Sequence, residues 1–274
     1  MGLRVNTNLY SLTAQRHLAD VSSRLAGNYA RLSSGLRIAV AADDAAGLGI
    51  SERMRAQIRS LNQAGRNAAD GISLVQTAEG SLSEVNANLT RMRELAIQSS
   101  NGTLNTGDRA TLNDEFAALI AEIDRVATQT DFNGTQLFDG TIATVAIQVG
   151  TESGETISIT LDDMTDTGLG LDGGTFDLTT VSNASAALAT IDTAIDSVNS
   201  FRGSLGATQN RLMSTARSIA STSENLSGAE SRIRDVDIAR ETADLTRNAI
   251  LQQAAVSVLA QANVQPQLAL SLLG

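Results

Sequence analysis

Few side chains in this sequence are suited to chemistry, and their spacing does not favour it. The chain has one histidine, His17, and no cysteine, so a metal site of imidazole or thiolate ligands would have a single such ligand. Two carboxylate pairs, Asp43–Asp44 and Asp162–Asp163, could act as acid and base or bind a cation, the second with help from Asp166. A phosphate-binding loop, a nucleophile elbow and a His-Glu-x-x-His motif are absent from the sequence.

The two carboxylate pairs have simpler structural explanations. Adjacent residues rarely converge on one substrate, whereas Asp43 or Asp44 is well placed to cap a helix that begins beside it. Asp162–Asp163 follows an alternating apolar stretch and fits a turn after a strand. It also lacks the alternating Asp positions and the distal Glu of a calcium loop. We therefore predict that the protein is not an enzyme and needs no cofactor or metal.

Charge and composition argue against nucleic acid and against membrane insertion. The formal net charge is -10, whereas a phosphate-binding surface requires the opposite sign. The N-terminus has no apolar signal-peptide core, and no run of about eighteen apolar residues occurs. From the residues alone the chain is expected in the cytoplasm, unless it is exported by a route that needs no cleaved signal.

The elements that organise the chain are helices, and one of them has an unusually regular pattern. Apolar residues recur in it at strict seven-residue intervals. Such a period arises when one narrow face of a long helix packs against a partner helix. Positions three residues further on are mostly small or hydroxyl-bearing, which lets partner helices approach closely. We call the apolar set the ladder: Ile191, Val198, Leu205, Leu212, Ile219, Leu226 and Ile233.

Two helices are predicted before the middle of the chain. An amphipathic pattern predicts a helix over 8–33, which Gly35 would end in a left-handed conformation. After a non-helical bridge, a longer helix should run from the cap at Asp43–Asp44 to the stop at Asn101–Gly102. One of its faces stays apolar over most of its length.

The middle of the chain changes its pattern. A shorter helix is predicted over 107–128, with Thr106 or Asp108 as its cap. Alternating apolar residues over 145–149 and 157–161, joined by a Gly-containing link, then predict a β-hairpin.

Two helices are predicted after the hairpin region. The chain returns to helix at about Asn183 and enters the ladder. A last helix follows a break near 236–240, and Pro266 is expected to end it.

These elements predict a mainly α fold, a long antiparallel coiled-coil helical bundle with a small β-hairpin region at about 135–182. An inner terminal helix pair would comprise 1–44 with 236–274, and an outer bundle would comprise 45–235. Because two helices alone bury little apolar surface, the terminal pair is predicted to be loose in a single subunit and ordered among neighbours.

The chain contains an ordered set of short motifs: Arg31–Ile38, Ala42–Leu48, Ile50–Arg55, Asp70–Gly80, Phe132–Gly134, Gly206–Leu212, Glu224–Leu226, Ala229–Asp237 and Leu259–Asn263. These segments closely resemble segments of bacterial flagellins. The resemblance covers about 1–140 and 183–274, and the motifs follow in the same order. Since only about forty residues separate the two regions, the chain is identified as a minimal member of the family, without the large variable outer domains.

The resemblance implies a structural subunit that assembles with itself into the helical, tubular flagellar filament, a propeller for motility. It also implies type III export without a cleaved signal, and an extracellular location. Expected partners are further copies of the chain, an export chaperone, the filament cap and hook–filament junction proteins; no nucleic acid and no membrane insertion are expected. The alternatives are a hook–filament junction protein of related build and a cytoplasmic coiled-coil signalling protein.

Two sets of residues are expected to hold the assembly together. In the outer bundle, the ladder should pack against the apolar face of the helix over 50–96. In the filament core, we expect a seam made by Leu18, Val21, Leu25 and Leu32 with Leu251, Val258 and Leu259.

Recognition by a host is implied by the resemblance alone. Arg91, Leu95 and Glu115 match the family surface that a Toll-like innate immune receptor reads. The terminal leucines resemble those that cytosolic immune receptors sense, and they are Leu270, Leu272 and Leu273.

Overall fold

The computed structural model describes residues 7–173 and 176–271, with side chains through residue 265. The described residues divide into two compact units, one formed by those up to 58 together with those from 224 onward, and the other by 59–223. The elements in chain order are α1 (Leu9–Ser34), α2 (Ala45–Ser99), α3 (Thr106–Gln129), β1 (Asp131–Phe132), β2 (Thr135–Gln136), β3 (Thr144–Gln148), β4 (Thr156–Thr160), α4 (Val181–Arg234) and α5 (Ile238–Ser271). The prediction of a mainly helical fold with long antiparallel helices and a mid-chain hairpin is confirmed.

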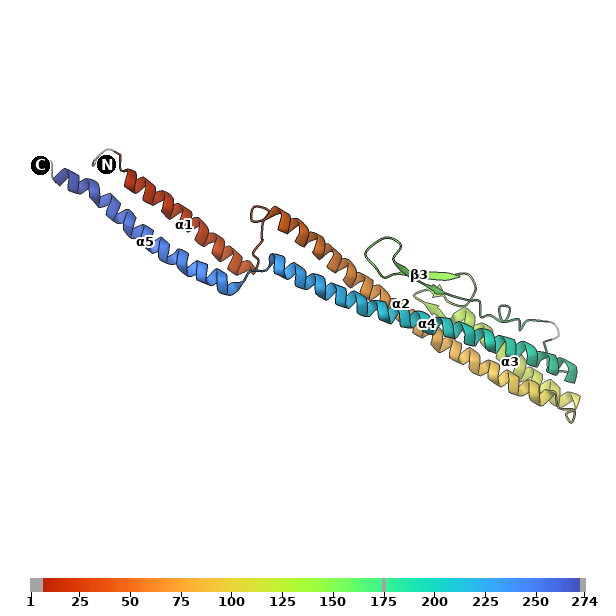
Figure 1. Ribbon diagram of the computed structural model, residues 1–274. Helices are drawn as coiled ribbons and strands as arrows, with labels where there is room; N and C mark the ends of the chain where they lie inside the picture. Colours follow the sequence, from red (N-terminus) through yellow and green to blue (C-terminus); the bar gives the residue numbers. More distant parts are fainter. Residues whose placement is uncertain (1–6, 174–175, 272–274) are drawn as a thin grey trace. The chain divides into compact units, whose positions relative to one another are not determined.

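In the first unit, α1 and α5 lie side by side and antiparallel (Figure 1). The predicted start and end of α1 are confirmed. The Asn8 side chain accepts a hydrogen bond from the Ser11 N–H at 3.2 Å and so caps the first turn. At the other end Gly35 has φ +71°, and its N–H donates to the Arg31 carbonyl. A left-handed residue costs glycine least, which explains why the helix ends there.

The two linkers between the helices of this unit are paired with each other. The Val236 N–H donates to the Gly35 carbonyl at 3.0 Å, and the Arg37 N–H donates to the Arg234 carbonyl at 2.6 Å. The predicted breaks near 34–43 and 236–240 are present at 35–44 and 235–237, the second ending earlier than expected because α5 begins at Ile238. Backbone groups that the helix ends leave free therefore find partners in the opposite linker.

The carboxylate pair at the start of α2 has two structural tasks. Asp44 caps α2, since its Oδ1 accepts a hydrogen bond from the Gly47 N–H at 2.9 Å. Asp43 accepts from the N–H groups of Ala39 and Val40 in the linker, and these bonds hold the pKa of its carboxyl below the ordinary value. Of the two caps considered, Asp44 is the one present.

The expected end of α5 at Pro266 is wrong, because the helix continues to Ser271. A proline inside a helix offers no N–H to the carbonyl four residues earlier, which here belongs to Ala262. The Asn8 side chain of α1 donates its Nδ2–H to that carbonyl at 2.7 Å. The acceptor that Pro266 leaves open is thus satisfied from the partner helix.

In the second unit, α2 and α4 run antiparallel with α3 beside them (Figure 1). The side-chain pairs Glu79–Arg202 and Arg93–Asp192 link α2 to α4 in opposite sequence order. Phe116 and Ile123 of α3 are buried. The fully buried side chains that α2 contributes to this core include Leu82, Val85, Leu89, Met92 and Leu95.

The cap of α3 lies one residue earlier than expected. Asn105 is the N-cap: its Oδ1 accepts from the Asp108 N–H at 2.9 Å, and Asp108 accepts in return from the Asn105 N–H at 3.2 Å. This is a reciprocal capping box. Thr106 is already helical, so the expectation of Thr106 or Asp108 as the cap is wrong, although Asp108 takes part.

The predicted hairpin is confirmed as β3 and β4, with Val145 opposite Ile159 and Ile147 opposite Ile157. A smaller hairpin, β1–β2, turns through Asn133 (φ 53°) and Gly134 (φ 78°), angles that favour these two residue types. Among the described residues, every helix falls short of the sustained apolarity of a membrane-spanning segment.

Candidate assembly surfaces

Most of the ladder lies in the core of the unit formed by 59–223. Ile191, Val198, Leu205 and Leu212 are almost fully buried, and Ile219 is nearly so. Removing one such side chain down to alanine typically costs about 2–5 kcal/mol. The last two ladder residues, Leu226 and Ile233, lie in the other unit and are half-buried.

Exposed ion pairs border this core. Arg93 of α2 and Asp192 of α4 approach to 2.6 Å, and the hydrogen bond from Arg93 holds the pKa of the Asp192 carboxyl below its ordinary value. Arg202 of α4 and Glu79 of α2 approach to 2.7 Å. Because such exposed pairs contribute little to stability, the ladder and its partners carry the energy and the ion pairs mainly fix alignment.

The seam between α1 and α5 is thinner and more polar. Its positions follow steps of three and four along both helices, as in a coiled coil. Ser11, Asn28 and Glu241 are among its buried residues. The seam positions are Ser11, Ala14, Leu18, Val21, Leu25, Asn28 and Leu32 in α1, and Glu241, Leu245, Asn248, Gln252, Ala255, Leu259 and Ala262 in α5.

The structure brings only part of the predicted core set together. Leu18, Val21, Leu25 and Leu32 are half-buried on the α1 seam, and Leu259 is half-buried on the α5 seam. In contrast, Leu251 is 44% exposed and Val258 is 59% exposed, so both lie on the outer surface of the helix pair.

This outer surface was not recognised from the periodicity. Large apolar side chains are exposed along α5 and on α1, although soluble proteins rarely leave large continuous apolar patches uncovered. A signal was present in the sequence, because no charged residue follows Arg247. The exposed apolar side chains are Leu9, Tyr10, Leu12 and Tyr29 of α1, and Ile238, Ile250, Leu251, Val256, Val258 and Val264 of α5.

The residues matched to an innate immune receptor lie where α2 and α3 adjoin. Arg91 is exposed and pairs with Glu94 of its own helix and with Glu115 of α3, each at 2.9 Å. These acids raise the pKa of Arg91, with Glu94 contributing most. Leu95 is 0% exposed. Of the terminal leucines, Leu272 and Leu273 lie outside the described residues, as does the side chain of Leu270.

Arg109 has a structural role that the sequence patterns did not indicate. Its guanidinium is buried and donates to the carbonyls of Ser99, Asn101 and Leu104 at 3.0, 2.8 and 2.8 Å. These carbonyls lie at the end of α2 and in the loop to α3. One side chain therefore satisfies acceptors that the helix end leaves open.

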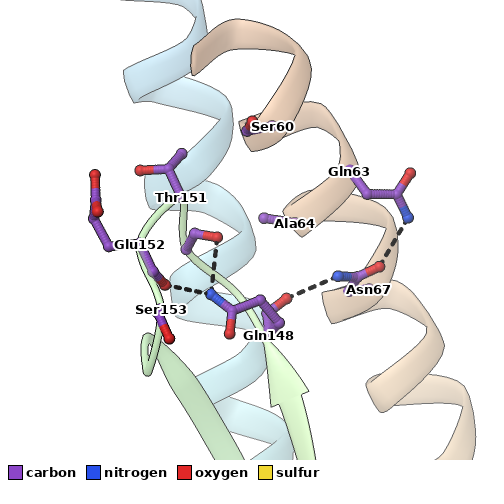
Figure 2. Close-up of a pocket in the computed structure, with 9 residues that line it drawn as sticks. Ser60, Gln63, Ala64, Asn67, Gln148, Thr151, Glu152 and Ser153 are labelled. Carbon is purple, nitrogen blue, oxygen red and sulfur yellow. Dashed lines mark hydrogen bonds between the residues drawn. The ribbon is translucent and has the colours of Figure 1, made fainter. Parts of the chain in front are cut away.

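A polar hollow of about 350 Å³ lies between α2 and the β3–β4 loop (Figure 2). Figure 2 shows its amides bonded to one another: Gln63 donates to Asn67, which donates to the Gln148 carbonyl at 3.0 Å. The Gln148 side chain in turn donates to the carbonyls of Gly150 and Glu152. These bonds hold the hairpin against α2.

The residues considered for chemistry stay apart. His17 is exposed on α1. Asp163 accepts hydrogen bonds from the backbone and hydroxyl of Thr165, which makes the turn expected after the strand. Within the described ranges, no group of three or more His, Asp or Glu side chains is arranged to hold a metal ion.

Comparison with known proteins assigns both helical regions of the chain to the same family. The model of the bacterial flagellin N-terminal helical region matches residues 5–143, and that of the C-terminal helical region matches residues 188–273. A flagellin of Halalkalibacterium halodurans is 50% identical to this chain, over 98% of this chain and 99% of its own length. A flagellin of Bacillus subtilis is 44% identical, over 99% of this chain and 100% of its own length.

A solved structure agrees with these relatives. The crystal structure of Bacillus cereus flagellin is 32% identical, with a TM-score of 0.52, and the match covers 60% of this chain and 94% of that one. The interpretation as a flagellin with a short middle region is confirmed, in preference to the alternatives of a hook–filament junction protein and a cytoplasmic signalling protein. The chain therefore belongs to the bacterial flagellins, the non-enzymatic structural subunits that polymerise into the extracellular flagellar filament.

Proposed function

We propose that this flagellin assembles mainly through its terminal helices. In this proposal, residues 1–44 and 236–274 form the inner part of a tubular filament, and residues 45–235 form the outer bundle. The observation that carries the proposal is the apolar outer surface of α5, with its exposed leucine, isoleucine and valine side chains. The occupants of that surface are the same helices of neighbouring copies.

Charge supports this assignment. A charged residue is costly to bury without a partner. After Arg247, α5 contains no charged residue, so this part of the helix can be buried without that cost. A helix that is apolar around most of its circumference is typical of a buried position. Packing against other copies would bury Leu251 and Val258, the two members of the predicted core set that the single chain leaves exposed.

We further propose that the terminal pair gains its stability on assembly. The seam of a single copy contains small and polar residues, among them Ser11, Ala14 and Ala262, so it buries little apolar area. Helices obtain most of their stability from such burial. A weak pair suits a subunit exported unfolded by the type III route. An export chaperone would cover the apolar part of α5 before export, and cap and junction proteins would contact it afterwards.

Electron microscopy tests the core assignment. Seeded and unseeded full-length chain should grow long filaments, whereas a version lacking about 1–40 and 240–274 should stay monomeric. Val258→Asp should prevent growth because it places a charge on the apolar surface. Ala243→Asp is the matched control, since residue 243 is also exposed on α5 but lies in its charged first turns. Filaments of Val258→Asp as long as those of Ala243→Asp would contradict the proposal.

A second proposed role is contact with an innate immune receptor through the exposed Arg91–Glu115 pair. The pair joins α2 to α3 on the surface, whereas Leu95 is fully buried in the core. In a receptor-reporter cell assay with monomeric protein, Arg91→Ala should weaken the response at least tenfold. Arg93→Ala is the control, because Arg93 is a neighbour paired instead with Asp192. Equal effects of the two variants would contradict this role.

A further inference from the structure

Apolar packing leaves the register of α1 on α5 open. The seam positions of both helices repeat every seven residues, so sliding one helix by seven residues again places seam positions opposite seam positions. The small residues of the seam give little penalty against such a slip. Polar groups must therefore choose among the alignments.

One polar anchor lies near the start of α1. Asn8 donates its Nδ2–H to the Ala262 carbonyl at 2.7 Å, and the Ser11 hydroxyl donates to Asn263 Oδ1 at 2.8 Å. The Ala262 carbonyl is the one that Pro266 leaves without a helical donor. The position of this open acceptor along α5 is set by the position of Pro266 in the sequence.

A second anchor lies near the end of α1. Asn28 is 2% exposed and donates its Nδ2–H to Glu241 Oε1 at 2.6 Å. Arg31 donates its Nε–H to the same oxygen at 2.8 Å. Asn28 Oδ1 accepts in turn from Asn248 at 2.8 Å. Four side chains of two helices thus form one network around a buried carboxylate.

Only the observed alignment satisfies both anchors. A slip of seven residues in one direction would place Glu241 opposite Val21, and a slip in the other direction would place it opposite Gly35, beyond the end of α1. In the first case a buried carboxylate faces an apolar side chain, and in the second it leaves the helix pair. Each slip also removes Asn8 from the Ala262 carbonyl. Buried polar residues in coiled coils fix register in the same way.

We propose that the two anchors set the register in which α1 and α5 pair when a subunit joins the filament. Asn8, Asn28 and Glu241 are then residues that determine the specificity of assembly. This inference rests on the proposed function, in which the terminal helices pair at the growing end. Correct register matters there because every later copy packs on the surface that the pair presents.

Cross-linking measures the register directly, because the chain contains no cysteine. Ser22→Cys with Gln252→Cys reports the observed alignment, since the Gln252 side chain reaches across to Ser22, with Nε2 3.5 Å from Oγ, so the two positions face each other. Ser22→Cys with Leu259→Cys, or with Leu245→Cys, reports the two slipped alignments. In the full-length chain, oxidised after seeded assembly, the first combination should give at least tenfold more intramolecular disulfide than either of the others.

The anchor variant carries Asn28→Leu and Glu241→Leu, which replace the buried polar groups of the second anchor with apolar side chains and still let the helices pair. Its slipped cross-links should rise at least tenfold, and fewer seeds should elongate. Arg247→Gln is the matched control: it removes a pair within α5, to Asp244, and leaves α1 untouched. An anchor variant that still cross-links only in the observed register overturns the inference, even where filaments form normally.

The two levels of the proposal fail in different ways. If the parent chain does not elongate seeds although it forms the Ser22→Cys/Gln252→Cys disulfide, the core assignment fails while the anchors still set the register. If the parent elongates seeds but all three reporter combinations cross-link equally, the anchors fail while the core assignment stands. Asn8→Ala is a second, independent variant. It should raise slipped cross-linking, and no rise would remove the first anchor from the inference.

Discussion

Three glycines of α2 lie in the unit formed by 59–223 and differ in how closely other side chains approach them. Replacing each by alanine therefore compares the tightness of packing at three positions of one helix. A side chain added at Gly80 would meet open space, and one at Gly65 would meet Ile219 at 3.8 Å, an ordinary contact. One added at Gly71 would lie 3.1 Å from Ile147 of β3 and 3.3 Å from Leu212 of α4. Of these three glycines, Gly71 therefore lies closest to the hairpin and the ladder.

The three alanine variants share one favourable contribution and differ in strain. Replacing glycine by alanine inside a helix gains about 0.5–1 kcal/mol through backbone entropy and propensity. Gly80→Ala and Gly65→Ala should therefore stabilise the unit by about that amount. At Gly71 the added methyl group must push aside the buried side chain of Leu212 and the half-buried side chain of Ile147, and overpacking of this kind typically costs about 1–3 kcal/mol. Gly71→Ala should be less stable than Gly80→Ala by about 1–3 kcal/mol.

Hydrogen exchange of the monomeric full-length chain is the suitable assay. A chain of two units need not unfold in one step, so backbone amides of α2 and α4 within 59–223 should be followed by mass spectrometry. The gain from helix propensity is common to the three alanine variants, so it cancels when their free energies of opening are subtracted. The remaining difference is the strain at Gly71. Circular dichroism serves as the control that helix content is unchanged. Equal protection in all three variants would refute a close approach at Gly71.

The remaining predictions concern the ladder, the α2–α3 loop and pH. Leu212→Ala should lower the free energy of opening by about 2–5 kcal/mol and half-buried Leu226→Ala by clearly less, measured by hydrogen exchange of the α4 amides around each site; equal losses would contradict the difference in burial. Arg109→Met should cost roughly 2–4 kcal/mol, because three carbonyls lose their donor, and should speed amide exchange in the α2–α3 loop; unchanged exchange would contradict that role. Paired carboxyls such as Asp192 have a lowered pKa, so their contribution is complete above the ordinary value of 3.8 and is lost as pH falls below it. The paired arginines have a raised pKa, so their contribution is lost only as pH rises above their ordinary range, and no lysine is present. The melting temperature should therefore stay level from about pH 6 to about pH 11, and a steep fall between pH 9 and pH 11 would contradict this.

The parts of the fold that local pattern dictates could be predicted from the sequence. The seven-residue period of the ladder exists because one face of α4 is buried, so the burial of Ile191 to Ile219 followed from spacing alone. Gly35 and the alternating strands of the hairpin are equally local signals, since each depends on the conformational preference of a few adjacent residues. The cap at Asn105 was missed by one residue because several polar residues there suit that position.

Features that depend on distant partners could not be predicted in this way. Pro266 signals a helix end only as long as its missing N–H stays uncompensated, and the donor that compensates is Asn8, from the far end of the chain. For a related reason the sequence did not indicate that Leu251 and Val258 lie outside the α1–α5 seam of a single chain. Apolar residues occur nearly all around that helix, so periodicity cannot choose which of them meet α1.

The two helix pairings of this chain rest on different physics, and the difference fits what each is proposed to do. The ladder closes over fully buried apolar side chains, so the unit formed by 59–223 has the material to hold its shape in a single copy. The α1–α5 pair has buried asparagine, serine and glutamate in its seam and leaves its large apolar side chains outside. Such a seam contributes alignment more than stability, because polar networks are sensitive to register but replace hydrogen bonds that water also offers. The proposed role, in which this segment crosses an export channel unfolded and then pairs in one register among identical copies, calls for that combination: specificity within the chain, and stability from its neighbours.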